Sequence, residues 1–385
     1  MNPSPRPPRI LVLTGGLIHL VPQLAVVATL LPEAMAPGAG GNRGDHGESP
    51  EGAPEREETP IAILITGVLR KQPAALAALH ADLERWLAVL RHRHPVFAGI
   101  RLAAVPEALG TGGWDLAALN NQWLVGQREV VERLGIRELV VCGDGLGVYY
   151  RCARELRAIL PSLLGLPIRD PGRTVRYVLS GRQPRWHRPP VPPEPAPEAA
   201  RLQLFAILVE ALRERGAGEL AHALTQAVPG RPLWLCSVPN LAHQFPGEQM
   251  PLDVLRRWAK GLRREGFDPA RDRLLLIDHP KAPPGGSFGP VTEPWLAPPL
   301  RSSLPLEVLI QLLSEARPGE DLRVCGMTSA LYGVRALTEA RVSWLGLAPL
   351  WHTNPLYRRK PLEWLHRWLR GRRMALLTSQ TGRIQ

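Results

Sequence analysis

The sequence predicts an α/β protein with two lobes, each built on a parallel sheet with helices on both faces. Short, fully apolar runs alternate with amphipathic segments along nearly the whole chain, as in repeated β-α units. The 385 residues exceed the usual size of one domain, and 45% of them are hydrophobic, which is enough for two cores. A proline-rich stretch interrupts the alternation near the middle. We therefore expect two Rossmann-like lobes that face a cleft.

The N-terminal lobe is expected to span residues 1–190 and to begin with a βα unit. Ile10–Leu13 is its strand, Thr14–Gly16 its turn and Leu17–Leu31 its helix. Residues 37–59 contain mostly Gly, Pro and Glu, so we expect a disordered loop there. The other elements expected in this lobe are strands at Ile61–Ile65, Ile100–Val105 and Glu138–Cys142, and helices at Ala74–His92, Leu119–Leu134 and Val148–Ile159.

An export signal or membrane anchor is an alternative for the N-terminus. Arg6 and Arg9 precede the apolar stretch Ile10–Leu31, and Ala34–Ala36 is similar to a signal-peptidase site. Pro37 directly after that site disfavours cleavage. Both interpretations, a βα unit and a signal, stay open on the sequence alone.

Residues 183–198 are expected to form a proline-rich linker to the C-terminal lobe, residues 199–385. Prolines at this density exclude a helix and the interior of a sheet, and they favour an extended backbone. The strands expected beyond it are Pro232–Ser237, Arg273–Asp278, Leu322–Cys325 and Val342–Leu347, and the helices are 199–214, 218–227, Leu252–Glu265, Leu304–Ala316, Ser329–Thr338 and Pro361–Arg370.

The chain is basic, with 47 Lys and Arg against 35 Asp and Glu and a formal net charge of +12. Nearly all these cations are arginines, and like charges form no long run, so we expect no nucleic acid partner. A non-catalytic protein that binds polyanions stays an alternative. The four cysteines form no Cys-x-x-Cys pair, which predicts neither a zinc site nor disulfides and fits the cytoplasm; they are Cys142, Cys152, Cys236 and Cys325.

Three polar segments come directly after predicted strands, where open parallel sheets bind their ligands. They are Gly143-Asp144-Gly145, His279-Pro280-Lys281 and Gly326-Met327-Thr328-Ser329. Asp144 is a candidate general base for a hydroxyl, and a helix cap or turn is the structural alternative. His279 and Lys281 are candidates to contact an anion. Thr328 and Ser329 stand where a helix begins, a position that suits a phosphate but also ordinary N-capping.

In this order the segments resemble three motifs of the bacterial sialyltransferases, including the capsule α-2,8-polysialyltransferases and the lipooligosaccharide sialyltransferases. The family's acidic-acidic-Gly, His-Pro and paired Ser/Thr motifs are matched by Gly143–Gly145, His279-Pro280 and Thr328-Ser329. Leu146–Tyr150, after the first motif, is also similar to the family pattern. The chain departs from it at Gly143, where an acid is usual, and at Thr328, where a serine is usual. An inactive member of the family is therefore an alternative.

The resemblance implies a two-lobed transferase of the GT-B architecture that needs no metal cofactor. Its donor would be CMP-sialic acid, its acceptor a glycan hydroxyl, and transfer would invert the anomeric configuration. Asp144 would act as the base and His279 on the departing CMP phosphate. The residues expected to hold the nucleotide are His279, Pro280, Lys281, Thr328, Ser329, Gly326 and, at the end of its own strand, Ser237. A GT-B transferase with another nucleotide sugar fits the same fold signals.

The segment Arg358–Arg373 alternates basic residues with Trp and Leu in the pattern of a basic amphipathic helix. Such a helix is suited to peripheral binding at the anionic inner face of the membrane. The alternative is a terminal helix whose Trp and Leu face packs on the core.

Overall fold

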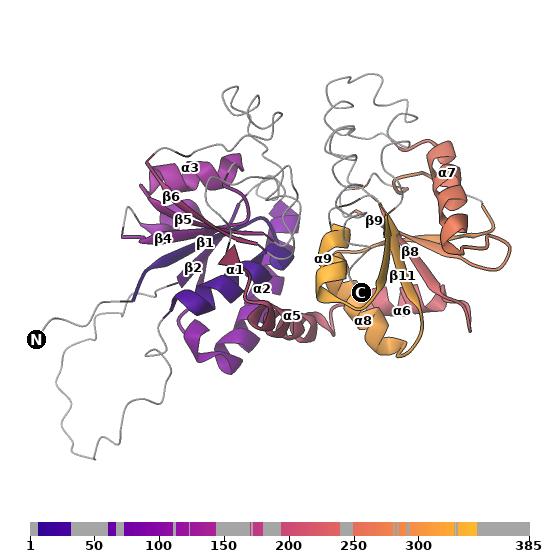
Figure 1. Ribbon diagram of the computed structural model, residues 1–385, viewed down its shortest axis with the longest axis horizontal. Helices are drawn as coiled ribbons and strands as arrows, with labels where there is room; N and C mark the ends of the chain where they lie inside the picture. The colour runs from indigo at the N-terminus through magenta and orange to yellow at the C-terminus, as the bar shows by residue number, and fades with distance from the viewer. Residues whose placement is uncertain are drawn as a thin grey trace, which may run out of the picture. The chain divides into compact units, whose positions relative to one another are not determined.

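The computed structural model of the protein contains two parallel β-sheets, one in each of two compact units, Met1–Leu212 and Arg213–Gln385 (Figure 1). The α/β class predicted from the sequence is confirmed. The structure describes residues 7–31, 61–66, 73–110, 113–122, 124–143, 170, 172–179, 194–238, 249–279, 282, 285–290, 293–326, 328 and 330–344.

The first unit is built on a seven-stranded sheet whose strands run in the order β3-β2-β1-β4-β5-β6-β7. Every neighbouring pair is parallel. The strands are β1 Ile10–Thr14, β2 Ile61–Ile65, β3 Arg101–Ala103, β4 Leu116–Leu119, β5 Glu138–Gly143, β6 Thr174–Leu179 and β7 Glu194–Pro195. The order 3-2-1-4-5-6 of the first six is that of a dinucleotide-binding Rossmann sheet.

Helices cover both faces of this sheet, whose central strands are almost entirely apolar. All residues of β1 and β2 are buried, which is the pattern of parallel strands between two helical layers. Helix α3 (Val125–Arg133) lies on one face, and α1 (Leu17–Leu30), α2 (Pro73–Arg93) and α5 (Glu198–Leu212) lie on the other (Figure 1). Two short 3₁₀ helices, η3 (Pro95–Phe97) and η4 (Pro106–Leu109), flank β3.

The second unit is built on a five-stranded sheet in the order β10-β9-β8-β11-β12, again with parallel neighbours only. Counted along the chain from β8, this is the order 3-2-1-4-5, so the second sheet repeats the topology of the first. Its strands are β8 Leu233–Ser237, β9 Leu274–Asp278, β10 Leu296–Arg301, β11 Leu322–Gly326 and β12 Arg341–Trp344.

The two faces of the second sheet carry different cores. Helices α6 (Ala217–Thr225), α8 (Leu306–Ala316) and α9 (Ala330–Leu337) enclose an aliphatic core on one face. On the other, α7 (Leu252–Leu262), continued by the 3₁₀ turn η5 (Arg263–Glu265), packs its apolar stripe over the sheet (Figure 1). Aromatic side chains meet edge to face there; the contacts are Trp234–Phe267, Trp258–Phe288 and Phe267–Trp295.

The structure corrects several predicted elements. The helix predicted at Leu119–Leu134 is the shorter helix α3, which begins only at Val125, and Leu119 is instead the last residue of the strand β4. Strands β4, β6, β7 and β10 were not predicted. Both β7 and β10 contain proline and lie at a sheet edge, where a missing N–H is tolerated because one side of the strand is unpaired.

The division between the units differs from the predicted linker at 183–198. Strand β7, inside that segment, pairs with β6. Helix α5, expected to open the C-terminal lobe, packs against α1 and α2 of the first unit, and Arg93 of α2 contacts Glu210 of α5 at 2.5 Å. The division therefore falls after Leu212.

Other predictions lie outside the described residues: the loop 37–59, the helices Val148–Ile159 and Pro361–Arg370, and the basic segment Arg358–Arg373. Residues 10–30 form the expected strand and helix, and β1 is an inner strand of its sheet. In the described ranges, no helix combines the length and the apolar character that crossing a bilayer requires.

Candidate functional site

The carboxyl ends of three neighbouring strands of the second sheet bring together residues predicted from distant parts of the sequence. Ser237 ends β8, His279 directly follows β9, and Gly326 ends β11. In the register of the sheet, Ser237 lies opposite Ile277 on one side and opposite Gly326 on the other. Four of the predicted nucleotide contacts, including Thr328, therefore gather at one edge of one sheet.

Ser237 and Thr328 form the centre of this edge. Their hydroxyl oxygens are 3.0 Å apart, within hydrogen-bond distance. Gly326 lies opposite Ser237 in the register of the sheet and two residues before Thr328. Its φ is 144°, and a Cβ built on it would lie 2.4 Å from the carbonyl oxygen of Ser237. Glycine is therefore required for β8 and β11 to approach so closely.

This hydroxyl pair lies at the topological switch point of its sheet. The strand order reverses between β8 and β11, because the chain builds outward from β8 in one direction and from β11 in the other. Helices that follow the two strands diverge to opposite faces, and the crevice between them is where open α/β sheets bind ligands.

The segment after β9 turns back on the sheet and is anchored there. The backbone carbonyl of His279 accepts a hydrogen bond from Ala282 N at 2.8 Å, which closes a tight turn. Further along, Ser287 is buried, its N–H faces the carboxylate of Asp278, and its carbonyl accepts a 2.7 Å hydrogen bond from Met250 N. The backbone beside His279 is thus fixed on both sides of the turn.

Asp278, to which the sequence analysis gave no role, lies at the same edge of the sheet. Its side chain ends β9 and is buried, with the residue only 4% exposed. Both carboxylate oxygens lie 3.3 Å from Ser287 N. In the sequence, Asp278 is recognisable as an acid at the end of an apolar strand. Burial of a carboxylate there costs free energy unless it has hydrogen-bond or ionic partners.

Two cysteines lie directly beneath the hydroxyl pair. Cys236 and Cys325 are opposite each other on β8 and β11, both are fully buried, and the Cys325 thiol donates to Leu235 O at 3.2 Å. Burial raises the pKa of the Cys236 thiol well above its ordinary value, and its contact with Cys325 and the charge of Asp278 raise it further. A neutral thiol is a small hydrophobic side chain, so the pair serves as core.

The switch point of the first sheet, between β1 and β4, is filled by side-chain amides. Gln23 of α1 donates to Leu13 O at 2.8 Å and to Ala118 O at 3.2 Å. Gln127 of α3 donates to the same Leu13 carbonyl at 2.9 Å from the opposite face. Both glutamines are buried, so the protein's own side chains fill the switch point of the first sheet.

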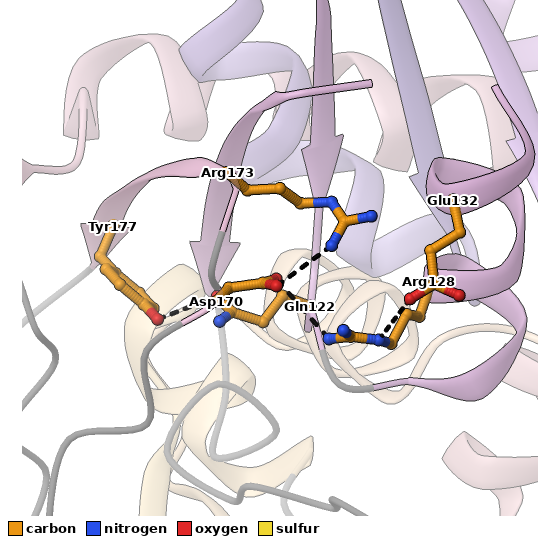
Figure 2. Close-up of polar contacts among 6 residues, drawn as sticks. All are labelled: Gln122, Arg128, Glu132, Asp170, Arg173 and Tyr177. Carbon is orange, nitrogen blue, oxygen red and sulfur yellow. Dashed lines mark hydrogen bonds and ion pairs between the residues drawn. The ribbon is translucent and has the colours of Figure 1, made fainter. Parts of the chain in front are cut away.

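A second polar cluster lies between α3 and β6 of the first unit (Figure 2). The buried carboxylate of Asp170 receives Arg173 at 3.1 Å and Arg128 at 3.6 Å, and Arg128 also binds Glu132 at 2.8 Å. Nearby, Tyr177 Oη donates to the side chain of Gln122 at 2.9 Å. Each arginine of the cluster is paired with Asp170 or Glu132. We therefore interpret the cluster as a structural link between α3 and β6 rather than as a binding site.

Four predicted site residues, Asp144, Pro280, Lys281 and Ser329, lie outside the described residues. For Asp144 the structure gives the preceding position, since Gly143 is the last residue of β5. Across the described ranges, no cluster of three or more His, Cys, Asp or Glu side chains has an arrangement suited to a metal ion.

Comparison of the chain with protein-family models, with curated proteins and with solved structures gave no match.

Proposed function

We propose that the protein is an inverting glycosyltransferase that moves sialic acid from CMP-sialic acid to a hydroxyl of an acceptor glycan, without a catalytic metal. The observation that supports this best is the Ser237–Thr328 hydroxyl pair at the switch point of the second sheet. The proposal includes a GT-B arrangement of the two units.

The chemistry of the edge suits a nucleotide phosphate. Ser237 and Thr328 share one hydrogen bond, so one hydroxyl proton remains to be donated to a phosphate oxygen. Helix α9 begins at Ala330, two residues after Thr328, and the positive end of a helix dipole favours an anion at such a position. His279 directly follows β9, the strand that pairs with β8, so it lies at the same edge of the sheet.

In the proposed reaction the oxygen of the acceptor hydroxyl attacks the anomeric carbon of the sialyl group. The new C–O bond forms as the bond to the CMP phosphate oxygen breaks, and the configuration inverts in one displacement. Asp144 takes the proton of the attacking hydroxyl. His279 donates a hydrogen bond or a proton to the departing phosphate, and Ser237 and Thr328 stabilise the charge that develops on it.

Titration calorimetry with CMP and CMP-sialic acid, together with an assay of CMP release, tests the proposal. His279→Ala is expected to weaken binding of both ligands at least about tenfold, the value of one charge-assisted hydrogen bond. His222→Ala, on α6 of the same unit, is the matched control and should bind as the unaltered protein does. Asp144→Ala should retain donor binding and lose transfer.

Two results would contradict the proposal. If the unaltered protein binds neither CMP nor CMP-sialic acid, the donor is wrong, and other nucleotide sugars are then the ligands to screen. If Asp144→Ala turns over at the normal rate, the assignment of the base is wrong.

A further inference from the structure

The carboxylate of Asp278 is buried with few partners. The residue is 4% exposed, and its hydrogen bonds among the described residues come from a single N–H, that of Ser287, shared between the two oxygens at 3.3 Å each. In the same ranges it forms no ion pair with an Arg, Lys or His. A carboxylate offers about four acceptor positions, and bonds of this length are at the weak end of the range.

Such an arrangement is costly for a folded protein. A buried carboxylate is normally paired with a cation or receives several donors, because removing it from water costs several kcal/mol otherwise. A second buried acid, Asp272, precedes β9. One of its oxygens accepts a 2.9 Å hydrogen bond from the backbone N–H of Asp268, and the other has no hydrogen-bond partner among the described residues. Both acids therefore have acceptor capacity left, but of the two only Asp278 lies at the carboxyl end of β9, where open parallel sheets bind ligands.

The position of Asp278 in the topology indicates which donors those are. It is the last residue of β9, the second strand of a sheet with the order 3-2-1-4-5, and it lies one strand from the switch point marked by Ser237 and Thr328. In Rossmann sheets an acid beyond the first βα unit accepts the ribose hydroxyls of a nucleotide whose phosphates lie at the switch point.

The loop over Asp278 packs closely against the carboxylate because it contains glycine. Gly286 has φ 88°, and a Cβ there would lie 2.9 Å from Asp278 Oδ2. Any larger residue would press on the carboxylate, whereas glycine lets the Ser287 N–H reach it. Contact between Asp278 and a ligand requires this segment to shift, which the conformational freedom of glycine favours.

We propose that Asp278 accepts hydrogen bonds from the 2′- and 3′-hydroxyls of a ribose, so that the site selects ribonucleotides over deoxyribonucleotides. The inference rests on the proposed function, since it uses the same edge of the second sheet, and adds to it the sugar of the nucleotide. It requires a nucleoside 5′-phosphate whose phosphate contacts Ser237 and Thr328 while its ribose reaches β9.

The first test uses the unaltered protein and two ligands, CMP and 2′-deoxycytidine 5′-monophosphate, in titration calorimetry. CMP is expected to bind at least about tenfold more tightly, because a hydrogen bond to a charged group is lost with the 2′-hydroxyl. Equal affinities overturn the inference while the proposed function stands. Binding of neither nucleotide also overturns the inference, and it overturns the proposed function as well if CMP-sialic acid does not bind.

The second test asks whether Asp278 causes the selection. In Asp278→Asn the ratio of the two affinities should fall to near one, since CMP loses the charged acceptor and the deoxynucleotide has less to lose. Asp272→Asn is the matched control and should keep the ratio of the unaltered protein. If Asp278→Asn weakens both ligands equally and keeps the ratio, Asp278 only positions the loop, and the inference is wrong. Thermal unfolding of both variants verifies that they are folded.

Discussion

Gly326 determines, at the scale of a single residue, how closely β8 and β11 approach at the candidate site. Its φ of 144 is a backbone conformation that side chains disfavour, and an added Cβ would meet Ser237 O at 2.4 Å. We expect Gly326→Ala to lower the free energy of unfolding by about 1–3 kcal/mol. It should also weaken CMP binding, because Ser237 and Thr328 would be pushed apart. Urea denaturation and calorimetry measure the two effects.

Gly218 provides the control for that substitution. It lies in α6 with no atom within 4 Å of an added Cβ. Gly218→Ala should therefore raise stability by about 0.5–1 kcal/mol, as alanine favours the helix. If Gly326→Ala is as stable as Gly218→Ala, the close approach of the two strands is not a constraint on the fold.

The position of individual candidate residues at one edge of a sheet was predictable where a polar residue ends or follows a strand. Ser237, His279, Gly326 and Thr328 lie there as expected, because each ends or follows an apolar run that is a strand. Asp278 was passed over because sequence shows that an acid ends a strand but not that the acid is buried. Likewise the sequence shows Gln23 only as a polar residue inside the apolar stretch Ile10–Leu31, and the fold shows the two backbone carbonyls to which it donates.

At the scale of elements, Asp170 joins α3 to the segment that leads into β6 (Figure 2). Its side chain is 2% exposed and lies between Arg128 and Arg173, which are themselves largely buried. Asp170→Ala would leave two buried cations without their shared partner, so we expect a loss of about 2–3 kcal/mol in unfolding free energy. Urea denaturation monitored by circular dichroism is the measurement.

The Arg176–Glu194 pair, which joins β6 to β7, is the contrast to Asp170. Its two hydrogen bonds are short, at 2.9 and 2.7 Å, but both side chains are exposed. Arg176 lowers the pKa of Glu194 chiefly through this hydrogen bond, so the pair contributes stability at neutral pH that is lost as the pH falls through the lowered pKa. Glu194→Ala should cost less than about 1 kcal/mol. A cost equal to that of Asp170→Ala would contradict the role given to burial.

Whole elements were predicted well where their apolar pattern was long and poorly where it was short or contained proline. The strands β1, β2, β8 and β9 are uniform apolar runs, and their positions were confirmed within a residue. In contrast, β4 has only four residues, all small or aliphatic, and so short a pattern does not distinguish strand from helix. The prolines of β10 and β7 exclude an inner strand but not an edge strand, and the sequence does not show which strands are at an edge.

At the scale of the whole molecule, the two units share one topology and differ at the switch point. Both sheets contain the order 3-2-1-4-5. In the first, Gln23 and Gln127 fill the crevice from opposite faces, whereas in the second the crevice is lined by Ser237, Thr328 and a glycine. Short hydroxyl side chains leave donors available to a ligand, and long amides satisfy the strand ends internally. The same fold therefore provides a structural edge in one unit and a candidate binding edge in the other.

The division of the chain after Leu212 makes a prediction about which fragment folds. The buried face of α5 includes six apolar side chains; they are Leu204, Phe205, Ile207, Leu208, Val209 and Leu212. Burial of each contributes about 1.5–3 kcal/mol, so together they match the whole stability of a typical domain. A fragment of residues 1–212 should therefore unfold cooperatively on heating, whereas a fragment of residues 1–197, which ends at the linker predicted from the sequence, should not.

Circular dichroism on heating and binding of a hydrophobic dye separate the two fragments. The shorter one should bind the dye strongly, because the faces of α1 and α2 that α5 covers become exposed. Equal cooperativity and equal dye binding in the two fragments would mean that α5 belongs with the second unit, as the proline-rich composition of 183–198 had suggested. The prediction depends on the apolar area that α5 buries against α1 and α2 and not on the proline-rich segment. Prolines show where the backbone is extended, whereas the unit against which the following helix packs determines where a domain ends.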